Sequence, residues 1–361
     1  MKRQGKTNIR LLSENELTDW LLARGEPRFR AKQIWQWLWQ KDVDSFDRMT
    51  NLSKSLRQLL NEHFYISKAG LAQTQKSTDG TLKNAVGLAD GLTVESVVIP
   101  SGKRITLCVS SQVGCSLDCR FCATARLKRM RNLTYDEIVD QVMQARHQAG
   151  EHFDARLTNI VFMGMGEPLL NYDNVLKAIR IITSPEALGM SPSRITLSTA
   201  GIPKMIRRLA DDNPRIGLAV SLHSAIDEVR SRLMPVNART GGLDALMDSL
   251  QYWYRKTRSK ITFEYLILRG INDNSEAIDA LIRYARRVPS KVNLIRYNPA
   301  DSFDPYEGAD ERWFETYRKR LQEAGITATV RHSAGADIDA ACGQLAGKWE
   351  AGVPKIPYKN L

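Results

Sequence analysis

The chain has 361 residues, of which 43% are hydrophobic and 25% are charged, and these proportions are ordinary for a soluble globular protein. It has no apolar run long enough to span a membrane, and no apolar segment of the kind that a secretion signal needs follows its basic first residues, so we expect a cytoplasmic protein. The net charge of +12 favours a polyanionic partner such as a nucleic acid, although a basic but merely solvated surface would also explain the charge.

The first 66 residues are predicted to form a small helical domain. Apolar residues recur at helical spacing in residues 14–22, 31–39 and 53–60. Trp35 and Trp39 lie at this spacing, which favours a position in the core, whereas Arg28 and Arg30 favour contact with a partner at the surface. We therefore expect residues 1–66 to be an N-terminal accessory domain that contacts RNA.

Two β-containing regions follow this domain. Residues 67–104 alternate polar and apolar side chains around two Asp-Gly turns, which predicts a short β-rich connector. After it, the predicted strands are residues 105–110, 159–163, 195–198, 217–221, 261–267 and 292–295, and helices are expected at 134–148, 172–182 and 275–287. Six βα units predict an α/β protein with a partial (β/α)6 barrel over residues 105–335, and a doubly wound sheet is the alternative. Residues 336–361 would then be a C-terminal loop and tail.

Three closely spaced cysteines lie near the start of this predicted barrel. Cys115, Cys119 and Cys122 follow the pattern C-x-x-x-C-x-x-C, and no further Cys or His follows until His147. A closed structural zinc site would need four protein ligands, whereas three thiolates on a four-iron cluster would leave one iron open to bind and cleave a small molecule. With the aromatic Phe121 before the last Cys, the pattern resembles the signature of radical S-adenosylmethionine (SAM) enzymes. A zinc knuckle or a loop of buried cysteines is the alternative.

A basic segment adjoins this motif. Between residues 120 and 131 there are five basic residues and no acidic one, namely Arg120, Arg126, Lys128, Arg129 and Arg131. Their positive field would act on a polyanionic substrate that approaches the open iron, so we expect this segment to engage RNA phosphates. A solvated basic face is the alternative.

Glycine and polar residues gather where the predicted strands end, which is where the active sites of such barrels lie. Gly164-Met165-Gly166-Glu167-Pro168 follows the second strand, and its glycines would let the amino group of SAM approach the backbone. Other strands end at Ser198, Ser221-Leu222-His223 and Tyr297-Asn298-Pro299. Each of these residues alone is more often a helix cap or a satisfied loop group, but together they suit the ribose and adenine edges of a nucleoside.

Two cysteines lie outside the motif. Cys108 belongs to an apolar run, where a buried structural Cys is the simplest interpretation. Cys342 lies among small residues in the segment 339–347, where packing does not require a Cys, and this favours a reactive thiol. An odd number of cysteines with a metal-type cluster fits a reducing compartment rather than a disulfide framework.

These motifs resemble those of the RlmN/Cfr family of RNA methyltransferases, and the match runs over nearly the whole chain. It is carried by the three-cysteine motif and by residues 29–35, 164–168, 221–223, 233–237 and 337–347. The resemblance to RlmN implies methylation of carbon 2 of an adenosine in 23S rRNA and, in many members, of the adenosine 3′ of some tRNA anticodons. Cfr enzymes methylate carbon 8 of the same rRNA adenosine, and Pro168 favours the RlmN branch.

The resemblance also implies roles for individual residues. Cys115, Cys119 and Cys122 would hold a 4Fe–4S cluster, and SAM would be contacted by Gly166, Glu167, Ser198, Ser221, Leu222, His223 and Asn298. Cys342 would carry the methyl group, Cys108 would resolve the adduct and Glu95 would accept a proton. Two SAM molecules would be used per turnover. The partners would be 23S rRNA before full ribosome assembly, tRNA, and an electron donor such as flavodoxin or ferredoxin, and the protein would act as a monomer away from membranes.

The chemistry that the family implies explains why two extra thiols are needed. Carbons 2 and 8 of adenine are electron-poor and lack a nucleophilic lone pair, so direct methyl transfer from SAM cannot reach them. In the family, one SAM methylates Cys342, and a 5′-deoxyadenosyl radical from a second SAM removes a hydrogen from that methyl group. The methylene radical adds to the ring, and Cys108 then attacks the sulfur of Cys342 to form a transient disulfide while a base removes the ring proton.

Two other functions stay open at this point. An RNA-binding protein with a zinc knuckle would explain the charge but neither Cys342 nor the glycine-rich loop, and a glycyl-radical activase would give no reason for the C-terminal Cys. One position departs from the family, because Ala334-Gly335 stands where an Arg-Gly pair is usual. The change puts one electrostatic contact of the Cys342 loop in doubt, although Arg331 is nearby.

Overall fold

The computed structural model describes residues 5–299, 305–347, 349 and 359. Its largest sheet has ten strands in the described residues. In chain order they are β3 (Gly70–Lys76), β4 (Leu82–Gly87), β5 (Thr93–Ser101), β6 (Arg104–Cys108), β9 (Asn159–Phe162), β10 (Ile195–Thr199), β11 (Gly217–Ser221), β12 (Ile261–Ile267), β13 (Ser290–Arg296) and β14 (Thr327–Arg331). They lie side by side in the order β14-β13-β12-β11-β10-β9-β6-β5-β4-β3.

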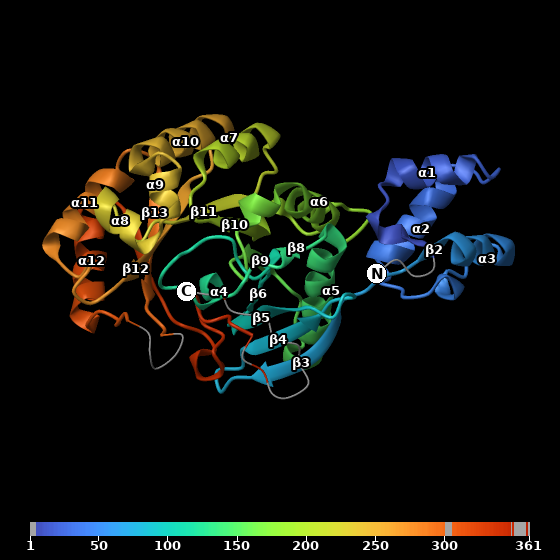
Figure 1. Cartoon of the computed structure of the whole chain (residues 1–361), viewed down its shortest axis with the longest axis horizontal. Helices are drawn as coiled ribbons and strands as arrows, with labels where there is room; N and C mark the ends of the chain where they lie inside the picture. Colours follow the sequence, from blue (N-terminus) through green and yellow to red (C-terminus); the bar gives the residue numbers. More distant parts are fainter. Residues whose placement is uncertain (1–4, 300–304, 348, 350–358, 360–361) are drawn as a thin grey trace.

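The part of this sheet from β6 to β14, seven of its ten described strands, is parallel and forms the predicted barrel. The main helices that follow its strands are α5 (Tyr135–Phe153), α6 (Tyr172–Thr183), α7 (Pro203–Asp212), α10 (Gly242–Thr257), α11 (Ser275–Ala285) and α12 (Glu311–Glu323). Figure 1 shows the strands curving with helices along their outer side. Six βα units are thus present in the described residues, which confirms the predicted fold class.

The sheet extends beyond the prediction at both ends. Strand β14 was not predicted, because it is a half-exposed edge strand whose alternating side chains give a weak signal. At the other end, β3, β4 and β5 form the expected meander, and β5 pairs antiparallel with β6. The meander is therefore continuous with the barrel sheet. The proposed division of the chain at residues 66, 104 and 335 stays a prediction, and its last part, residues 336–361, is only partly described.

Three N-terminal helices form a group beyond one side of the sheet (Figure 1). They are α1 (Glu14–Leu22), α2 (Phe29–Trp39) and α3 (Lys54–His63). Helix α1 begins with a capping box, in which Ser13 accepts from the Glu16 N–H and Glu16 accepts from the Ser13 N–H. Trp39 is fully buried and Trp35 is half-buried against the core, as its helical spacing indicated.

A buried ion pair joins the N-terminal helices to the barrel. The guanidinium of Arg10 lies 2.7 Å from the carboxylate of Asp140 on α5 and 4.5 Å from the centre of the Trp39 ring. Beside it, the amide of Asn8 donates to the carboxylate of Asp136, at 2.7 Å. Arg10 and Asp140 are both almost completely excluded from solvent, so water could not solvate either charge if its partner were lost. The helical group is thus attached to the barrel through a buried ion pair.

Replacement of Arg10 with Ala should therefore reduce the free energy of unfolding by about 3–5 kcal/mol, because it leaves the Asp140 carboxylate buried without its partner. The measurement is urea denaturation of the variant and the unmodified protein. The control is Arg208→Ala, which removes an exposed ion pair with Asp173 and should cost less than about 1 kcal/mol. Equal losses in the two variants would contradict this role for the buried pair.

Shorter elements connect these parts. They are β1 (Thr7–Asn8), β2 (Phe64–Tyr65), β7 (Gln112–Val113), β8 (Arg131–Asn132), α4 (Ala123–Arg126), α8 (Asp227–Leu233) and α9 (Val236–Arg239), with 3-10 turns at Ile9–Leu11, Phe46–Arg48, Pro168–Asn171, Pro192–Arg194 and Ala336–Ile338.

In the described ranges, no helix has both the length and the apolar character that a membrane crossing requires.

Candidate active site at the carboxyl ends of the strands

A single pocket collects most of the residues that the sequence singled out. It lies at the carboxyl ends of the parallel strands, where the loops after β6, β9, β10 and β11 meet the C-terminal segment. Among its lining residues are Cys115, Cys119, Cys122, Gly164, Gly166, Glu167, Ser198, Ser221, His223 and Cys342. Residues from five separate parts of the chain are thus brought to one cavity, as expected for a site at the strand ends of a barrel.

The loop that carries the three cysteines has a shape that only glycine permits at its start. Gly114 has a φ of +74°, and a Cβ atom there would lie 2.3 Å from the carbonyl oxygen of Lys128. Further along, the Arg120 N–H donates to the carbonyl of Leu233, and the ammonium of Lys359 lies 2.8 Å from Asp118. These contacts fix the loop, and its three cysteines line the pocket.

The donor set fits the cofactor of a radical SAM enzyme. Cys115 is buried and Cys119 and Cys122 are half-buried, and desolvation raises the pKa of all three thiols, that of Cys115 to about 12. In the described part of the chain, no three Cys, His, Asp or Glu side chains are arranged to hold a single metal ion. Three thiols on one pocket fit a cluster of several irons, in which each thiol binds a different iron.

The glycine-rich loop after β9 packs against the segment that leads to the cysteines. A Cβ atom on Gly164 would lie 2.7 Å from the hydroxyl of Ser110. Gly166 has a φ of +96°, and a Cβ atom there would lie 2.5 Å from the side chain of Gln112. Because neither neighbour can move away cheaply, these glycines are required by close packing as well as by access to the backbone.

Glu167 connects two adjacent strand ends. Its carboxylate accepts from the N–H groups of Leu169 at 3.0 Å and Ala200 at 2.7 Å. Burial raises the pKa of this carboxyl group to about 7, although the two N–H donors oppose the shift. The group lies on the pocket wall and is suited to accept a hydrogen bond from a bound amino group.

His223 also lines the pocket and is held as a neutral imidazole. It has a φ of +56°, and its Nδ1 accepts from the N–H of Leu266 at 3.1 Å, so Nε2 carries the ring hydrogen. Burial lowers the pKa of His223 to about 3, and the nearby Arg230 adds to this shift. The ring of Phe121 packs edge-on against it, with centroids 4.6 Å apart, and this contact joins the cysteine loop to the end of β11.

Two of the predicted SAM contacts lie outside the residues that line the pocket. Leu222 is fully buried, and its N–H donates to the carbonyl of Glu264. The amide of Asn298 donates to the carbonyl of Arg296, at 3.2 Å. Contacts from these residues to SAM stay predictions, whereas Ser198 and Ser221 line the pocket directly.

The two remaining thiols lie near each other beside an ion pair. Cys108 is the last residue of β6, and desolvation raises its pKa to about 12, with a further rise from Cys342. Cys342 is accessible through the pocket, yet desolvation raises its pKa as well. Arg331 opposes the rise at both thiols, and its guanidinium lies 3.4 Å from the carboxylate of Glu264 on β12.

Glu95 is buried outside the residues that line the pocket. Its carboxylate lies 3.3 Å from the ammonium of Lys83, and both side chains are about 1% exposed. Desolvation raises the pKa of Glu95, while Lys83 and the C-terminal residues Gly347 and Trp349 oppose the shift. The C-terminal segment therefore covers the residue that the family resemblance proposes as a proton acceptor.

Three charged residues of the site were not predicted as site residues from the sequence, although Arg331 was noted near the Cys342 loop. Glu264 and Arg331 line the pocket, and the guanidinium of Arg230 donates to the carbonyl oxygens of Ala200, Ser221 and Leu222 beneath it. A signal for Glu264 was available, because it is a lone acidic residue in a strand that is buried along its whole length. A buried charge in a central strand favours a functional position.

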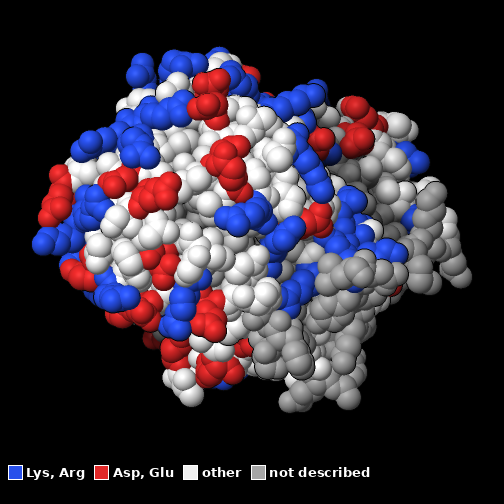
Figure 2. All heavy atoms as spheres, turned by 60° about the vertical axis from the view of Figure 1, so that its left-hand side comes forward, with Lys and Arg blue, Asp and Glu red and all other residues white. Residues whose placement is uncertain are grey.

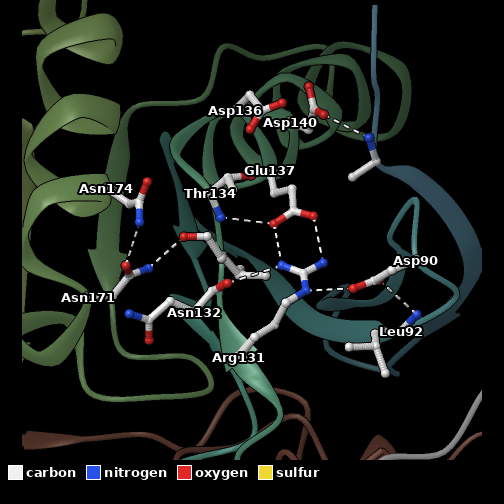
Figure 3. A network of polar contacts seen from close by, with 12 residues as sticks. Asp90, Leu92, Arg131, Asn132, Thr134, Asp136, Glu137, Asp140, Asn171 and Asn174 are labelled. Carbon is white, nitrogen blue, oxygen red and sulfur yellow. Dashed lines mark hydrogen bonds and ion pairs between the residues drawn. The ribbon is translucent and has the colours of Figure 1, made fainter. Parts of the chain in front are cut away.

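The basic segment beside the cysteine motif is only partly available to a partner. Figure 3 shows the guanidinium of Arg131 between two acids: it donates twice to Glu137, at 2.8 Å each, and once to Asp90, at 2.6 Å. Carboxylates of the protein therefore already pair with Arg131, and its engagement of RNA phosphates stays a prediction. Lys128 and Arg129 are exposed. Figure 2 shows one face on which acidic and basic side chains are interspersed, with Lys and Arg gathered toward its right-hand part.

Similarity to known protein families defines the class of enzyme. The model of the radical SAM superfamily matches residues 109–282, which include the cysteine loop, the glycine-rich loop and the ends of β10 and β11. The protein is thus a radical SAM enzyme, a class that uses a 4Fe–4S cluster and SAM. A second family, described as the ribosomal RNA large subunit methyltransferase N-terminal domain, matches residues 7–66.

Relatives over the full length identify the family. A probable dual-specificity RNA methyltransferase RlmN from Christiangramia forsetii is 56% identical over 343 residues, which are 95% of this chain and 97% of that protein. A dual-specificity RNA methyltransferase RlmN from Nitratidesulfovibrio vulgaris (strain DP4) is 46% identical, over 94% of each chain. The crystal structure of a radical SAM methyltransferase from Sphaerobacter thermophilus matches with a TM-score of 0.87 and 38% identity, over 94% of this chain and 99% of that one. The chain belongs to the RlmN family and is a SAM-dependent radical methyltransferase.

Proposed function

We propose that this protein methylates carbon 2 of an adenosine in 23S rRNA and of the adenosine 3′ of the anticodon in some tRNAs, through a methyl group carried on Cys342. The observation that carries the proposal is that Cys342 opens on the same pocket as the three cysteines of the radical SAM motif. A methyl group on that thiol would lie within the cavity that binds SAM. The names of the relatives, which specify RNA methyltransferases of the RlmN type, favour carbon 2 over the carbon-8 chemistry of Cfr.

Cys115, Cys119 and Cys122 would hold the 4Fe–4S cluster, which when bound supplies the electron that cleaves SAM to methionine and a 5′-deoxyadenosyl radical. Gly166 and Glu167 would receive the amino group of SAM, because Glu167 is a hydrogen-bond acceptor on the pocket wall. Ser198, Ser221 and His223 would face the ribose and the adenine. Two SAM molecules are required per turnover, since one supplies the methyl group and the other the radical.

The two other thiols would complete the transfer. The sulfur of Cys342 attacks the methyl carbon of the first SAM and releases S-adenosylhomocysteine. After the 5′-deoxyadenosyl radical removes a hydrogen atom from that methyl group, the methylene carbon bonds to the adenine ring. The radical adduct then gives one electron to a one-electron carrier of the flavodoxin or ferredoxin class and the ring proton to a base. Cys108 attacks the sulfur of Cys342, so that the carbon–sulfur bond breaks as the disulfide forms; the carbon keeps the bonding pair and takes a proton to become the methyl group. Two electrons from an external dithiol then restore both cysteines. Glu95 is the proposed proton acceptor, and burial makes its carboxylate a stronger base than an exposed one.

The proposed partners follow from this reaction. RNA is the substrate class, with 23S rRNA met before full ribosome assembly, and the N-terminal helical domain is proposed to contact it. A low-potential donor such as flavodoxin or ferredoxin would reduce the cluster. We propose that the protein acts as a monomer and that it is located in the cytoplasm.

The test is reconstitution of the purified protein with iron and sulfide under anaerobic conditions, followed by reaction with SAM, a reductant and a 23S rRNA fragment. Nucleosides are then separated and identified by mass spectrometry. The proposal expects 2-methyladenosine. Formation of 8-methyladenosine would assign the protein to the Cfr chemistry, and the absence of any methyladenosine would refute the proposal.

Exposed charges beside the cysteine loop should contribute to RNA binding. The double variant Lys128→Ala/Arg129→Ala should weaken the salt dependence of RNA affinity, with the slope of log affinity against log salt falling by about 0.9 for each phosphate contact removed. Filter binding at several salt concentrations gives this slope. The control is Arg208→Ala, an exposed arginine on α7. An unchanged slope in the double variant would show that Lys128 and Arg129 are solvated surface residues that do not contact RNA phosphates.

A further inference from the structure

The segment that carries Cys342 is attached to the tip of the β3–β4 hairpin. The carboxylate of Asp337 accepts from the Ser77 hydroxyl at 2.6 Å, from the Thr78 N–H at 3.0 Å and from the Thr78 hydroxyl at 3.2 Å. These residues are about 260 positions apart in the sequence, so the contact is a tertiary one between the first antiparallel strands and the end of the chain.

A second carboxylate, which belongs to the hairpin itself, completes the attachment. Asp79, in the hairpin turn, accepts from the N–H of Gly335 at 2.8 Å and from the N–H of Thr81 at 2.8 Å. Although burial opposes it, these hydrogen bonds lower the pKa of Asp79 to about 2, and hydrogen bonds also lower the pKa of Asp337. Both groups are therefore ionised at neutral pH, and each bond to them is charge-assisted.

The backbone at Gly335 is shaped for this contact. Gly335 has a φ of +67°, and a Cβ atom there would lie 2.8 Å from the Cβ of Ala340 and 2.9 Å from the side chain of Thr81. The attachment uses the N–H of residue 335 and the side chain of residue 337. It therefore requires nothing from the side chain at position 334, where this chain has Ala in place of the family's usual Arg.

Cys342 lies between this attachment and another one. On its C-terminal side, the carbonyl of Gly343 accepts from the N–H of Ala123 at 2.8 Å, and the carbonyl of Leu345 accepts from the Thr124 hydroxyl at 2.6 Å. Those two partners belong to α4, directly after the last cysteine of the motif. The hairpin thus holds the segment before Cys342, and the cysteine loop holds the segment after it.

We propose that Asp79 and Asp337 are positioning residues for Cys342, and that together they keep its thiol directed into the pocket. The proposal rests on the proposed function in that it treats Cys342 as the methyl carrier. Neither aspartate lines the pocket, so they act on the reaction only through the segment that they hold. Without them, the segment between β14 and Cys342 would lose its contacts with the tip of the hairpin, and the thiol would spend less time in the pocket.

The test combines thiol reactivity with kinetics, using the reconstituted holoenzyme under anaerobic conditions. In Asp337→Ala and Asp79→Ala, alkylation of Cys342 by iodoacetamide, followed by peptide mass spectrometry, should become about tenfold faster, the factor expected from loss of charge-assisted hydrogen bonds. Alkylation of Cys108 should not change. The rate of RNA methylation should fall by a similar factor while the affinity for SAM stays constant.

Conservative and control variants separate positioning from damage to the fold. Asp337→Asn keeps one acceptor oxygen and should give intermediate values, and Asp244→Asn, which alters an exposed ion pair on α10, should behave as the unmodified protein. Unchanged alkylation and methylation in both alanine variants would overturn the proposal, as would a loss of SAM affinity equal to the loss of rate. The alkylation comparison needs no RNA, so it judges this proposal even if the unmodified enzyme fails to methylate RNA.

Discussion

Replacement of Cys108 with Ala is expected to leave the enzyme covalently joined to its RNA. The variant still has Cys342 and the radical SAM motif, so it should load the methyl group and attack the adenine. It has no second thiol to attack the sulfur of Cys342, and release should stop at the adduct. Nearly all RNA that reacts should then migrate with the protein on a denaturing gel, and nuclease should remove the shift.

The matched variant is Cys342→Ala, which should fail earlier in the same sequence. It has no sulfur to accept a methyl group, so it should bind SAM normally and leave the RNA free and unmodified. The contrast depends on the order of events rather than on either cysteine merely being important. If Cys108→Ala turned over normally, or if both variants left free and unmodified RNA, Cys108 would be only a packed residue at the end of β6.

Replacement of Cys119 with Ala should abolish both the bound iron and the cleavage of SAM. Only two of the three thiols that the motif offers to the cluster would remain. The iron content and the absorbance at about 400 nm should therefore fall to background after reconstitution. Iron analysis and the visible spectrum measure this directly.

Cys342→Ala serves as the control for this experiment as well. Cys342 lines the same pocket but lies outside the motif, so its loss should leave the full iron content in place. A full complement of iron in Cys119→Ala would show that the cluster is held by other residues.

The fold was predictable where its strands carry strong patterns. Strand β12 consists of seven buried residues, and its predicted bounds match those observed. Strand β14 was missed although three of its five residues are β-branched, because it is short, half-exposed and at the edge of the sheet. The continuity of the β3–β5 meander with the barrel depends on the pairing of β5 with β6, which no local pattern encodes.

The residues of the site were predictable where the spacing or position of a residue type is typical of one chemical role. Closely spaced cysteines, a glycine-rich loop and a histidine at a strand end all line the observed pocket. The partners of Arg131 could not be predicted because the sequence shows a charge but not what it contacts, and Glu137 and Asp90 come together only in the folded chain. The contacts of Asp79 and Asp337 could not be predicted for the same reason, since they join residues about 256–260 positions apart.

The central claim is that the methyl group reaches RNA through Cys342 and loses a hydrogen on the way. The most direct measurement uses SAM whose methyl group carries three deuterium atoms, with mass spectrometry of the methyladenosine and of the 5′-deoxyadenosine formed. Passage through Cys342 predicts a product methyl group with two deuterium atoms and one hydrogen, and one deuterium in 5′-deoxyadenosine. A product that keeps all three deuterium atoms would show direct transfer from SAM and would contradict the account.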